Sequence, residues 1–222
     1  AEEQERTCAA ARAAGFQPVS APLLRMEDVA FSLPASLPPA LLFTSARAPG
    51  PAARQYPQLR ELPVYAVGHH SAGAARAAGF RVRMEGARDG SAIVAAAAEG
   101  GEARLLHLTG AEHAALDGPA GLSIERRTVY RAVAAGALPD AAVSALRRGA
   151  LALLLSPRTA EIFARLFDAA ALPRDKTGLA LISRATAAGA GPGWRAVAVA
   201  EQPDLRASLA AAQLLWHKQQ DG

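Results

Sequence analysis

The sequence predicts an α/β fold made of two similar units with parallel sheets. The first observation is that short apolar runs of strand length repeatedly end in Ser or Thr and continue into a helix-forming segment. The second is that both halves of the chain follow this plan at similar spacing. Ser45 and Ser71 in the first half are separated by nearly the same interval as Ser156 and Thr186 in the second. The repetition predicts two units joined by extended connectors.

The elements alternate along the chain. Residues 2–14 are rich in Ala, Arg and Glu and predict a helix that ends at Gly15. Strands are predicted at residues 16–19, 40–43, 63–68, 104–110, 127–133, 150–155 and 178–182. Helices are predicted after the hydroxyl-bearing turns that follow residues 40–43, 63–68, 150–155 and 178–182. The helix expected after Arg47 must be displaced or shortened, because prolines interrupt residues 49–51. Residues 22–27 are extended and, with residues 127–133, form the predicted connectors.

The charge of the chain favours small anionic ligands. The 222 residues carry a net charge of +4, almost entirely from arginine, because Lys176 and Lys218 are the only lysines. The arginines are spread along the chain and are not interleaved with aromatic residues, so no nucleic-acid partner is expected. A few forked guanidinium groups can instead bind carboxylates individually.

Several other classes of protein are excluded. No apolar run is long enough to span a bilayer, since the best candidate, residues 150–155, has the length of a strand, and no membrane association is expected. The acidic first residues and the single cysteine, Cys8, predict a cytoplasmic protein without disulfides. There is no Walker loop, no strand-linked GxGxxG, no Gly-x-Ser-x-Gly and no histidine pair at metal-binding spacing. We therefore expect no metal and no nucleotide cofactor.

The candidate site residues each admit a structural and a functional interpretation. Hydroxyls at the strand-to-helix turns either cap helices or bind an anion with free backbone N–H groups. They are Thr44, Ser45, Ser71, Ser156 and Thr186. Tyr130 is either a half-buried strand aromatic or a proton donor beside arginines. Arg47 and Arg158, which are equivalent in the two units, are either solvated or bind carboxylates.

An ordered set of motifs over essentially the whole chain resembles the uroporphyrinogen-III synthase family. The motifs are residues 42–47 (LFTSAR), 64–72 (VYAVGHHSA), 79–80 (GF), 108–110 (LTG), 128–130 (TVY) and 199–203 (VAEQP). The resemblance implies a HemD-like fold of two flavodoxin-like α/β units, one inserted into the other through a two-stranded ladder. The first domain would comprise residues 1–24 and 133–222 and the second residues 28–130. Residues 22–27 and 127–133 would form the ladder.

The resemblance also implies an activity. Members of the family cyclise linear hydroxymethylbilane to uroporphyrinogen III, with loss of water, inversion of the terminal pyrrole ring and no cofactor. The substrate would be supplied by hydroxymethylbilane synthase, and the protein would act as a monomer. Tyr130 matches the family tyrosine proposed to assist departure of the hydroxyl. The expected substrate-binding residues are Thr44, Ser45, Arg47, His69, Ser71, Gly110, Ser156, Arg158 and Thr186.

Three departures from the family pattern leave alternatives open. Family members normally begin with a strand before the first helix, so that strand either precedes this sequence or is missing from the first domain. Ser71 replaces a threonine, and Ser183-Arg184 stands where Gly-Pro is common. An inactive paralogue, or a two-lobed protein that binds a small anion without chemistry, would use the same turns. A poised Tyr130 would favour the enzyme, because a binding protein needs no proton donor.

Overall fold

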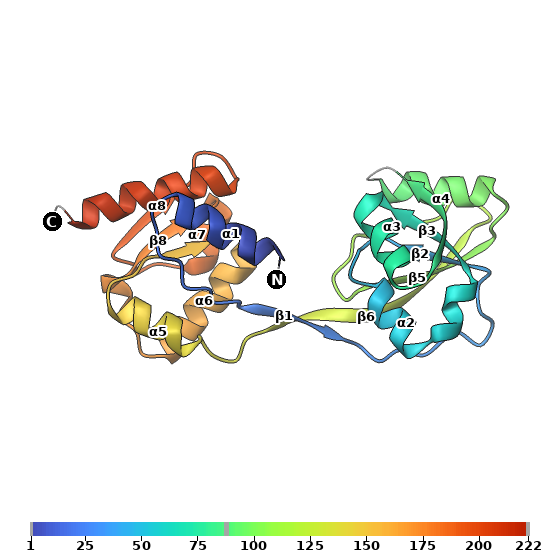
Figure 1. The fold of residues 1–222 in the computed structure, drawn as a ribbon, viewed down its shortest axis with the longest axis horizontal. Helices are drawn as coiled ribbons and strands as arrows, with labels where there is room; N and C mark the ends of the chain where they lie inside the picture. Colours follow the sequence, from blue (N-terminus) through green and yellow to red (C-terminus); the bar gives the residue numbers. More distant parts are fainter. Residues whose placement is uncertain (1, 87–88, 221–222) are drawn as a thin grey trace. The chain divides into compact units, whose positions relative to one another are not determined.

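The computed structural model describes residues 2–86 and 89–220 and divides the chain into two compact units (Figure 1). Unit 1 comprises Ala1–Arg25 and Ala134–Gly222, and unit 2 comprises Met26–Val133. Residues 1, 87–88 and 221–222, which fall within the predicted domains, lie outside the described residues. None of the helices in the described ranges has the length and apolarity needed to cross a membrane. The predicted α/β class with parallel sheets is confirmed.

Unit 2 contains a sheet whose central strands are short and completely buried. Five strands pair in parallel in the order β6-β5-β2-β3-β4, and β1 lies beside β6. Backbone bonds from Val29 N–H to Val129 C=O and from Ala135 N–H to Leu23 C=O run in the antiparallel sense along β1 and β6. The strands are β1 (Leu24–Asp28), β2 (Ala40–Phe43), β3 (Pro63–Val67), β4 (Arg81–Gly86), β5 (Arg104–Gly110) and β6 (Ser123–Ala134).

The strand order of unit 2 corrects one detail of the prediction. Counted along the chain from β2 to β6, the order is 3-2-1-4-5, whereas a flavodoxin-like sheet has the order 2-1-3-4-5. The difference lies at β4, which pairs with β3 instead of lying on the far side of β2. The winding direction therefore reverses between β2 and β5. In open α/β sheets, ligands bind outside the carboxyl ends of the strands at such a reversal.

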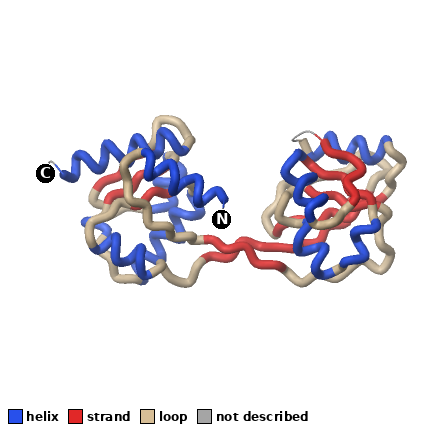
Figure 2. The backbone as a smooth tube through the Cα atoms, in the orientation of Figure 1, coloured by secondary structure: helices blue, strands red, loops and turns tan. Residues whose placement is uncertain are grey.

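Helices cover both faces of the sheet in unit 2 (Figure 2). One face packs Leu41, Phe43 and Leu106 against α2 and α3, and the other packs Leu42 and Leu105 against α4. Strands that are buried on both faces are expected to be continuously apolar, as β2 is. The helices are α2 (Pro49–Gln55), a 3₁₀ segment (Pro57–Glu61), α3 (Gly68–Ala77) and α4 (Gly90–Glu99).

Unit 1 has a three-stranded parallel sheet in the order β7-β8-β9 within its described residues. Its core is built around α6, whose Phe163 and Phe167 contact the ring of Trp194. The strands are β7 (Ala152–Leu154), β8 (Gly178–Leu181) and β9 (Ala196–Val199). The helices are α1 (Glu2–Ala13), α5 (Asp140–Arg147), α6 (Pro157–Ala169), a 3₁₀ segment (Arg174–Lys176), α7 (Arg184–Ala190) and α8 (Leu205–Gln220).

Some predicted elements differ from the structure. Residues 16–19 form no strand, because Pro18 has no N–H for a ladder and no neighbouring strand pairs with this segment. The predicted helix displacement is confirmed, since α2 begins only at Pro49. The predicted elements do not include β4, β9, α4, α5 or α8. Strand β4 is an edge strand with alternating charged residues, so it lacks the apolar run that marks the central strands.

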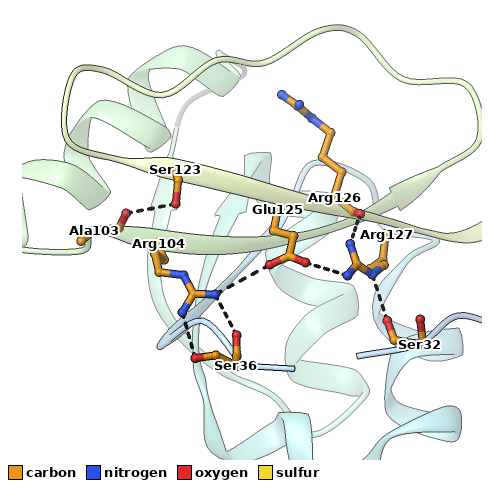
Figure 3. Close-up of polar contacts among 8 residues, drawn as sticks. All are labelled: Ser32, Ser36, Ala103, Arg104, Ser123, Glu125, Arg126 and Arg127. Atoms are coloured by element: carbon orange, nitrogen blue, oxygen red, sulfur yellow. Dashed lines mark hydrogen bonds and ion pairs between the residues drawn. The ribbon is translucent and has the colours of Figure 1, made fainter. Parts of the chain in front are cut away.

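Two arginines of unit 2 attach the connector between β1 and β2 to the sheet (Figure 3). Arg104 donates to the hydroxyl and carbonyl oxygens of Ser36 at 3.1 and 2.8 Å, and Arg127 Nε donates to the Ser32 carbonyl at 2.9 Å. Both guanidinium groups also contact the Glu125 carboxylate, at 3.7 and 2.6 Å. These cations are therefore used by the fold and are not available to a ligand.

Arg174 links the end of α6 to the loop before β9 in unit 1. Its guanidinium binds both oxygens of Asp168, at 2.7 and 2.6 Å, donates to the Pro192 carbonyl at 2.9 Å, and lies 4.7 Å from the centre of the Trp194 ring. We expect Arg174→Ala to lower the free energy of unfolding of unit 1 by about 1 to 2 kcal/mol. Urea unfolding followed by tryptophan fluorescence measures this loss. Arg165→Ala, at an exposed position of α6, is the matched control and should cost less than about 0.5 kcal/mol.

The same contact predicts a pH dependence. The Arg174 guanidinium, through its hydrogen bonds, lowers the pKa of Asp168 below the ordinary aspartate value. A carboxyl with a lowered folded-state pKa stabilises the fold above its unfolded pKa, and this contribution disappears as the pH falls through the folded pKa. Arg174→Ala should therefore reduce the acid sensitivity of unit 1. An identical acid dependence in both proteins would show that the pair does not contribute.

Candidate functional site

The predicted site residues of unit 2 gather where β2, β5 and β6 meet. Thr44 and Ser45 directly follow β2, Gly110 ends β5, and Tyr130 lies on β6 beside Gly110. These positions form the carboxyl edge of β2 and β5, where the winding direction reverses. Thr44 and Ser45 do not cap α2, because its N-cap is Ala48 and no side chain caps it. The capping interpretation is therefore wrong for these two hydroxyls.

A bulge in β6 positions Tyr130. The parallel register pairs Thr109 with Thr128 and then Gly110 with Tyr130, so Val129 is the additional residue. Bulges re-aim side chains and are frequent beside active sites. Val129 is completely buried, while Tyr130 lies half-buried at the strand ends. A Cβ atom at position 110 would lie 2.7 Å from Cζ of Tyr130, so this ring requires a glycine beneath it.

Tyr130 is held by Ser45. Its hydroxyl donates to Ser45 Oγ at 2.9 Å, and the Arg47 backbone N–H donates to the same oxygen at 3.2 Å. Ser45 Oγ thus accepts two hydrogen bonds from the protein, and its own hydrogen remains for a further acceptor. The same hydrogen bond places the backbone of Arg47 at this edge.

Arg47 differs from the other arginines of its unit. Within residues 26–86 and 89–133, it is the arginine whose guanidinium makes no hydrogen bond or ion pair. The Arg47 side chain is exposed. Exposure is compatible with both predicted alternatives, a solvated residue and a residue that binds a carboxylate. An available cation next to the Tyr130–Ser45 pair is what an anionic substrate requires.

Two histidines complete this edge, and neither is among the predicted site residues. His107 Nε2 lies 2.9 Å from Thr44 Oγ1, and His113 Nδ1 lies 3.1 Å from the Gly110 carbonyl oxygen. Because a carbonyl only accepts, His113 Nδ1 carries the donated proton. Burial, with smaller effects from Arg126 and His113, lowers the pKa of His107 to about 4. A polar residue within the apolar residues 104–110 was the sequence signal that could have indicated this position.

His69 and Ser71 lie at the neighbouring turn between β3 and α3. Gly68 adopts a left-handed φ of 75° there, which lets the chain enter the helix directly from the strand. The His69 ring is exposed, and its Nδ1 lies 3.3 Å from the Glu85 carboxylate. Ser71 is buried in the first turn of α3. The structure therefore brings His69 next to a negative charge, which disfavours an anion at its Nδ1 side.

The remaining predicted residues belong to unit 1. Ser156 caps α6 by accepting from the Thr159 N–H at 3.2 Å, as the structural interpretation holds. Arg158 lies half-buried in the first turn of that helix. Thr186 is completely buried, and its hydroxyl lies 3.0 Å from Ser183, which caps α7.

A pocket of about 450 Å³ lies at the carboxyl ends of β8 and β9 in unit 1. Ser183, Arg184, Ala200 and Glu201 are among its lining residues. Residues 199–203 are one of the motifs on which the family resemblance rests. In the described ranges no three His, Cys, Asp or Glu side chains gather as metal ligands.

The fold and the strand-end site together define the class of protein. The chain consists of two α/β units joined by β1 and β6. Unit 2 carries hydroxyls, a tyrosine and an arginine without a partner among the described residues where the winding direction of its sheet reverses. The sequence model of the uroporphyrinogen-III synthase HemD family matches residues 5–210. The chain therefore belongs to the uroporphyrinogen-III synthase family.

The fold is similar to that of a solved structure. The chain is similar to the uroporphyrinogen-III synthetase of Helicobacter pylori, with a TM-score of 0.56 and 18% sequence identity over 87% of this chain and 91% of that chain. It also matches the uroporphyrinogen III synthase of Thermus thermophilus, with a TM-score of 0.37 and 17% identity over 97% of this chain and 95% of that chain. No curated protein matches the chain.

Proposed function

We infer that the protein is an enzyme of tetrapyrrole biosynthesis that cyclises hydroxymethylbilane to uroporphyrinogen III. The reaction removes the terminal hydroxyl of the linear bilane as water and closes the ring with the last pyrrole inverted. The observation that carries the assignment of the site is the Tyr130–Ser45 hydrogen bond over Gly110, next to the unpaired Arg47.

The substrate fits the chemistry of this edge. Each pyrrole carries acetate and propionate groups, which accept hydrogen bonds and bear negative charge. We propose that Arg47, Thr44 and Ser45 bind such carboxylates, with charge-assisted hydrogen bonds that are about twice as strong as neutral ones. Ser71, Gly110 and His69 would line the same strand ends. We also propose that Ser156, Arg158 and Thr186 of unit 1 bind the substrate.

Tyr130 would act on the leaving group. Its O–H, now bound to Ser45 Oγ, is placed to donate to the departing substrate hydroxyl, which leaves as water. The electron-rich pyrroles stabilise the resulting cation. The substituted carbon of the last ring attacks this cation and forms a spiro intermediate. Its original bond to the neighbouring bridge carbon then breaks, the bridge carbon bonds to the unsubstituted α-carbon of the same ring, and the proton lost from that α-carbon returns to Tyr130. Over the whole reaction the substrate loses one water molecule, and the protein neither gains nor loses a proton.

Positioning decides which product forms. The bilane loses its hydroxyl readily, and closure without an enzyme gives the wrong isomer. The protein must therefore hold the bilane so that the substituted carbon of its last ring is the nearer nucleophile. The selectivity for the III isomer then comes from the orientation of the substrate. Several carboxylate contacts along the substrate supply such orientation better than one strong contact.

The test is an isomer assay. Bilane is generated with purified deaminase, the protein is added, and the oxidised porphyrins are separated. We expect the III isomer to dominate. If only the I isomer accumulated, as it does without enzyme, the protein would be a binding protein or an inactive paralogue and the proposed function would be wrong.

Arg47→Ala is expected to raise KM about tenfold and to change kcat little, because it removes one charge-assisted contact to the bound substrate. Initial rates over a range of bilane concentrations separate the two constants. Arg81→Ala is the matched control, since this exposed arginine of unit 2 begins β4 at the opposite, amino end of its strand and pairs with Glu61. An unaltered KM for Arg47→Ala would identify Arg47 as a solvated residue.

The remaining expectations concern the context of the reaction. We propose that hydroxymethylbilane synthase supplies the substrate, that the protein acts as a monomer, and that it does so in the cytoplasm. The short lifetime of a bilane that cyclises spontaneously supports direct supply by the preceding enzyme.

A further inference from the structure

His107 is the most deeply buried ionisable group at the strand ends of unit 2. It lies on β5, opposite Leu42 of β2 and Arg126 of β6, and only 1% of its surface is exposed. Its Nε2 lies 2.9 Å from Thr44 Oγ1, and its Nδ1 has no hydrogen-bond partner among the described residues. The two ring nitrogens are therefore not equivalent, and the proposed reaction does not use the ring directly.

The unequal partners decide where the ring carries its hydrogen. A neutral imidazole has one N–H and one lone pair. If Nδ1 carried the hydrogen, a buried donor would have no acceptor, which costs about 1 to 3 kcal/mol and is rare in native proteins. With the hydrogen on Nε2, the donor is satisfied by Thr44 and only a lone pair is left unpaired. The positive charge of Arg126, across the ladder, also disfavours additional positive charge on this ring.

The tautomer sets the direction of the Thr44 hydroxyl. If Nε2–H donates to Thr44 Oγ1, the threonine hydrogen cannot point to His107 and must be offered elsewhere. No acceptor for it exists among the described residues. Ser45 is in the same state, because its oxygen already accepts from Tyr130 and from the Arg47 N–H. Two adjacent hydroxyls thus present hydrogens to whatever occupies this edge.

We propose that His107 is a positioning residue that, as the Nε2–H tautomer, makes Thr44 an obligate hydrogen-bond donor to a carboxylate of the substrate. This inference rests on the proposed function for the identity of the substrate. A carboxylate only accepts hydrogen bonds, so an edge that offers two hydroxyl hydrogens and Arg47 selects it over amides and alcohols that must also donate.

The tautomer is measured directly by the ¹⁵N shifts of histidine side chains in the labelled full-length protein at neutral pH. His107 is assigned by comparison with His107→Gln, and we expect the neutral Nε2–H form. Thr44→Val should shift the His107 Nε2 resonance, because the partner oxygen is removed. A neutral Nδ1–H form, or a charged ring at neutral pH, would overturn the proposal.

Kinetics test the effect on the substrate. We expect His107→Leu to raise KM for the bilane about tenfold with kcat changed less, and Thr44→Val to do the same. Because both variants remove the same donor, the Thr44 hydroxyl, the KM of the double variant should be no higher than that of the more impaired single variant. Additive effects of about a hundredfold would show that the two residues act independently.

Conservative and control variants keep the test decisive. His107→Gln can place an amide N–H near the position of Nε2, so its KM should be close to that of the wild type. This variant tests the proposal even if His107→Leu folds poorly. His217→Leu, on the exposed side of α8 in unit 1, should leave KM unchanged. If the wild-type protein gave only the I isomer, the proposed function would fail, while the ¹⁵N measurement would still decide the state of His107.

Discussion

Tyr130→Phe is expected to lower kcat about a hundredfold, at the lower end of what general acid catalysis contributes. The substitution removes the O–H that donates to Ser45 Oγ at 2.9 Å and leaves the ring in place over Gly110. KM should change little, because the phenol acts on the leaving group and not on the carboxylates. Stopped assays with chromatographic separation of the porphyrins measure both the rate and the isomer ratio.

The folded state provides the control for this variant. Tyr130 packs beside the core of unit 2 through its ring, which phenylalanine retains. The unfolding transition should therefore stay within a few degrees of the wild type. A wild-type kcat in Tyr130→Phe would show that the tyrosine hydroxyl does not assist the departure of water. Solvent water would then be the proton donor.

Gly110→Ala is expected to reduce kcat about as much as Tyr130→Phe. A Cβ atom at this position would lie 2.7 Å from Cζ and 2.9 Å from Oη of Tyr130, distances at which the ring must move. The displaced hydroxyl loses Ser45 and its position toward the substrate. Overpacking of this kind also costs about 1 to 3 kcal/mol of stability.

A second glycine separates the local effect from the general effect of adding a methyl group. Gly73 lies in α3, and a Cβ there would meet nothing within 4 Å, so Gly73→Ala should keep full activity and stabilise the helix by about 0.5 to 1 kcal/mol. The double variant Gly110→Ala with Tyr130→Phe should be no slower than either single variant, because both act through one hydroxyl. Full activity of Gly110→Ala would disprove the packing argument.

Much of the fold could be predicted from local patterns. Continuous apolar runs identified β2, β3, β5 and β8, because strands buried on both faces of a parallel sheet have no polar alternation. The prolines at residues 49–51 correctly displaced α2. Strand β4 escaped detection because an edge strand carries charged residues, and the flavodoxin-like order was wrong because strand order depends on where each crossover lands.

The candidate site could be predicted only in part. The residue pattern indicates Thr44, Ser45 and Tyr130 as candidates, the resemblance adds Gly110, and the structure brings all four to one edge of one sheet. His107 is not among the residues that the sequence predicts for the site. Its contact with Thr44 joins residues 63 positions apart in the chain, and no local pattern encodes such a contact. Ser156 and Ser183 are helix caps, because their hydroxyl oxygens accept from the backbone N–H groups of Thr159 and Thr186.

The sequence by itself determined the α/β class, the repetition of hydroxyl-bearing turns and the family, because these depend on residue types at short spacing. The tertiary structure alone decided which of those residues meet. The bulge at Val129 pairs Tyr130 with Gly110, the burial of His107 leaves one ring nitrogen without a partner among the described residues, and hydrogen bonds or ion pairs occupy the other described arginines of unit 2 but not Arg47. Each of these is set by contacts between distant segments, whose energies depend on geometry that a linear pattern does not contain.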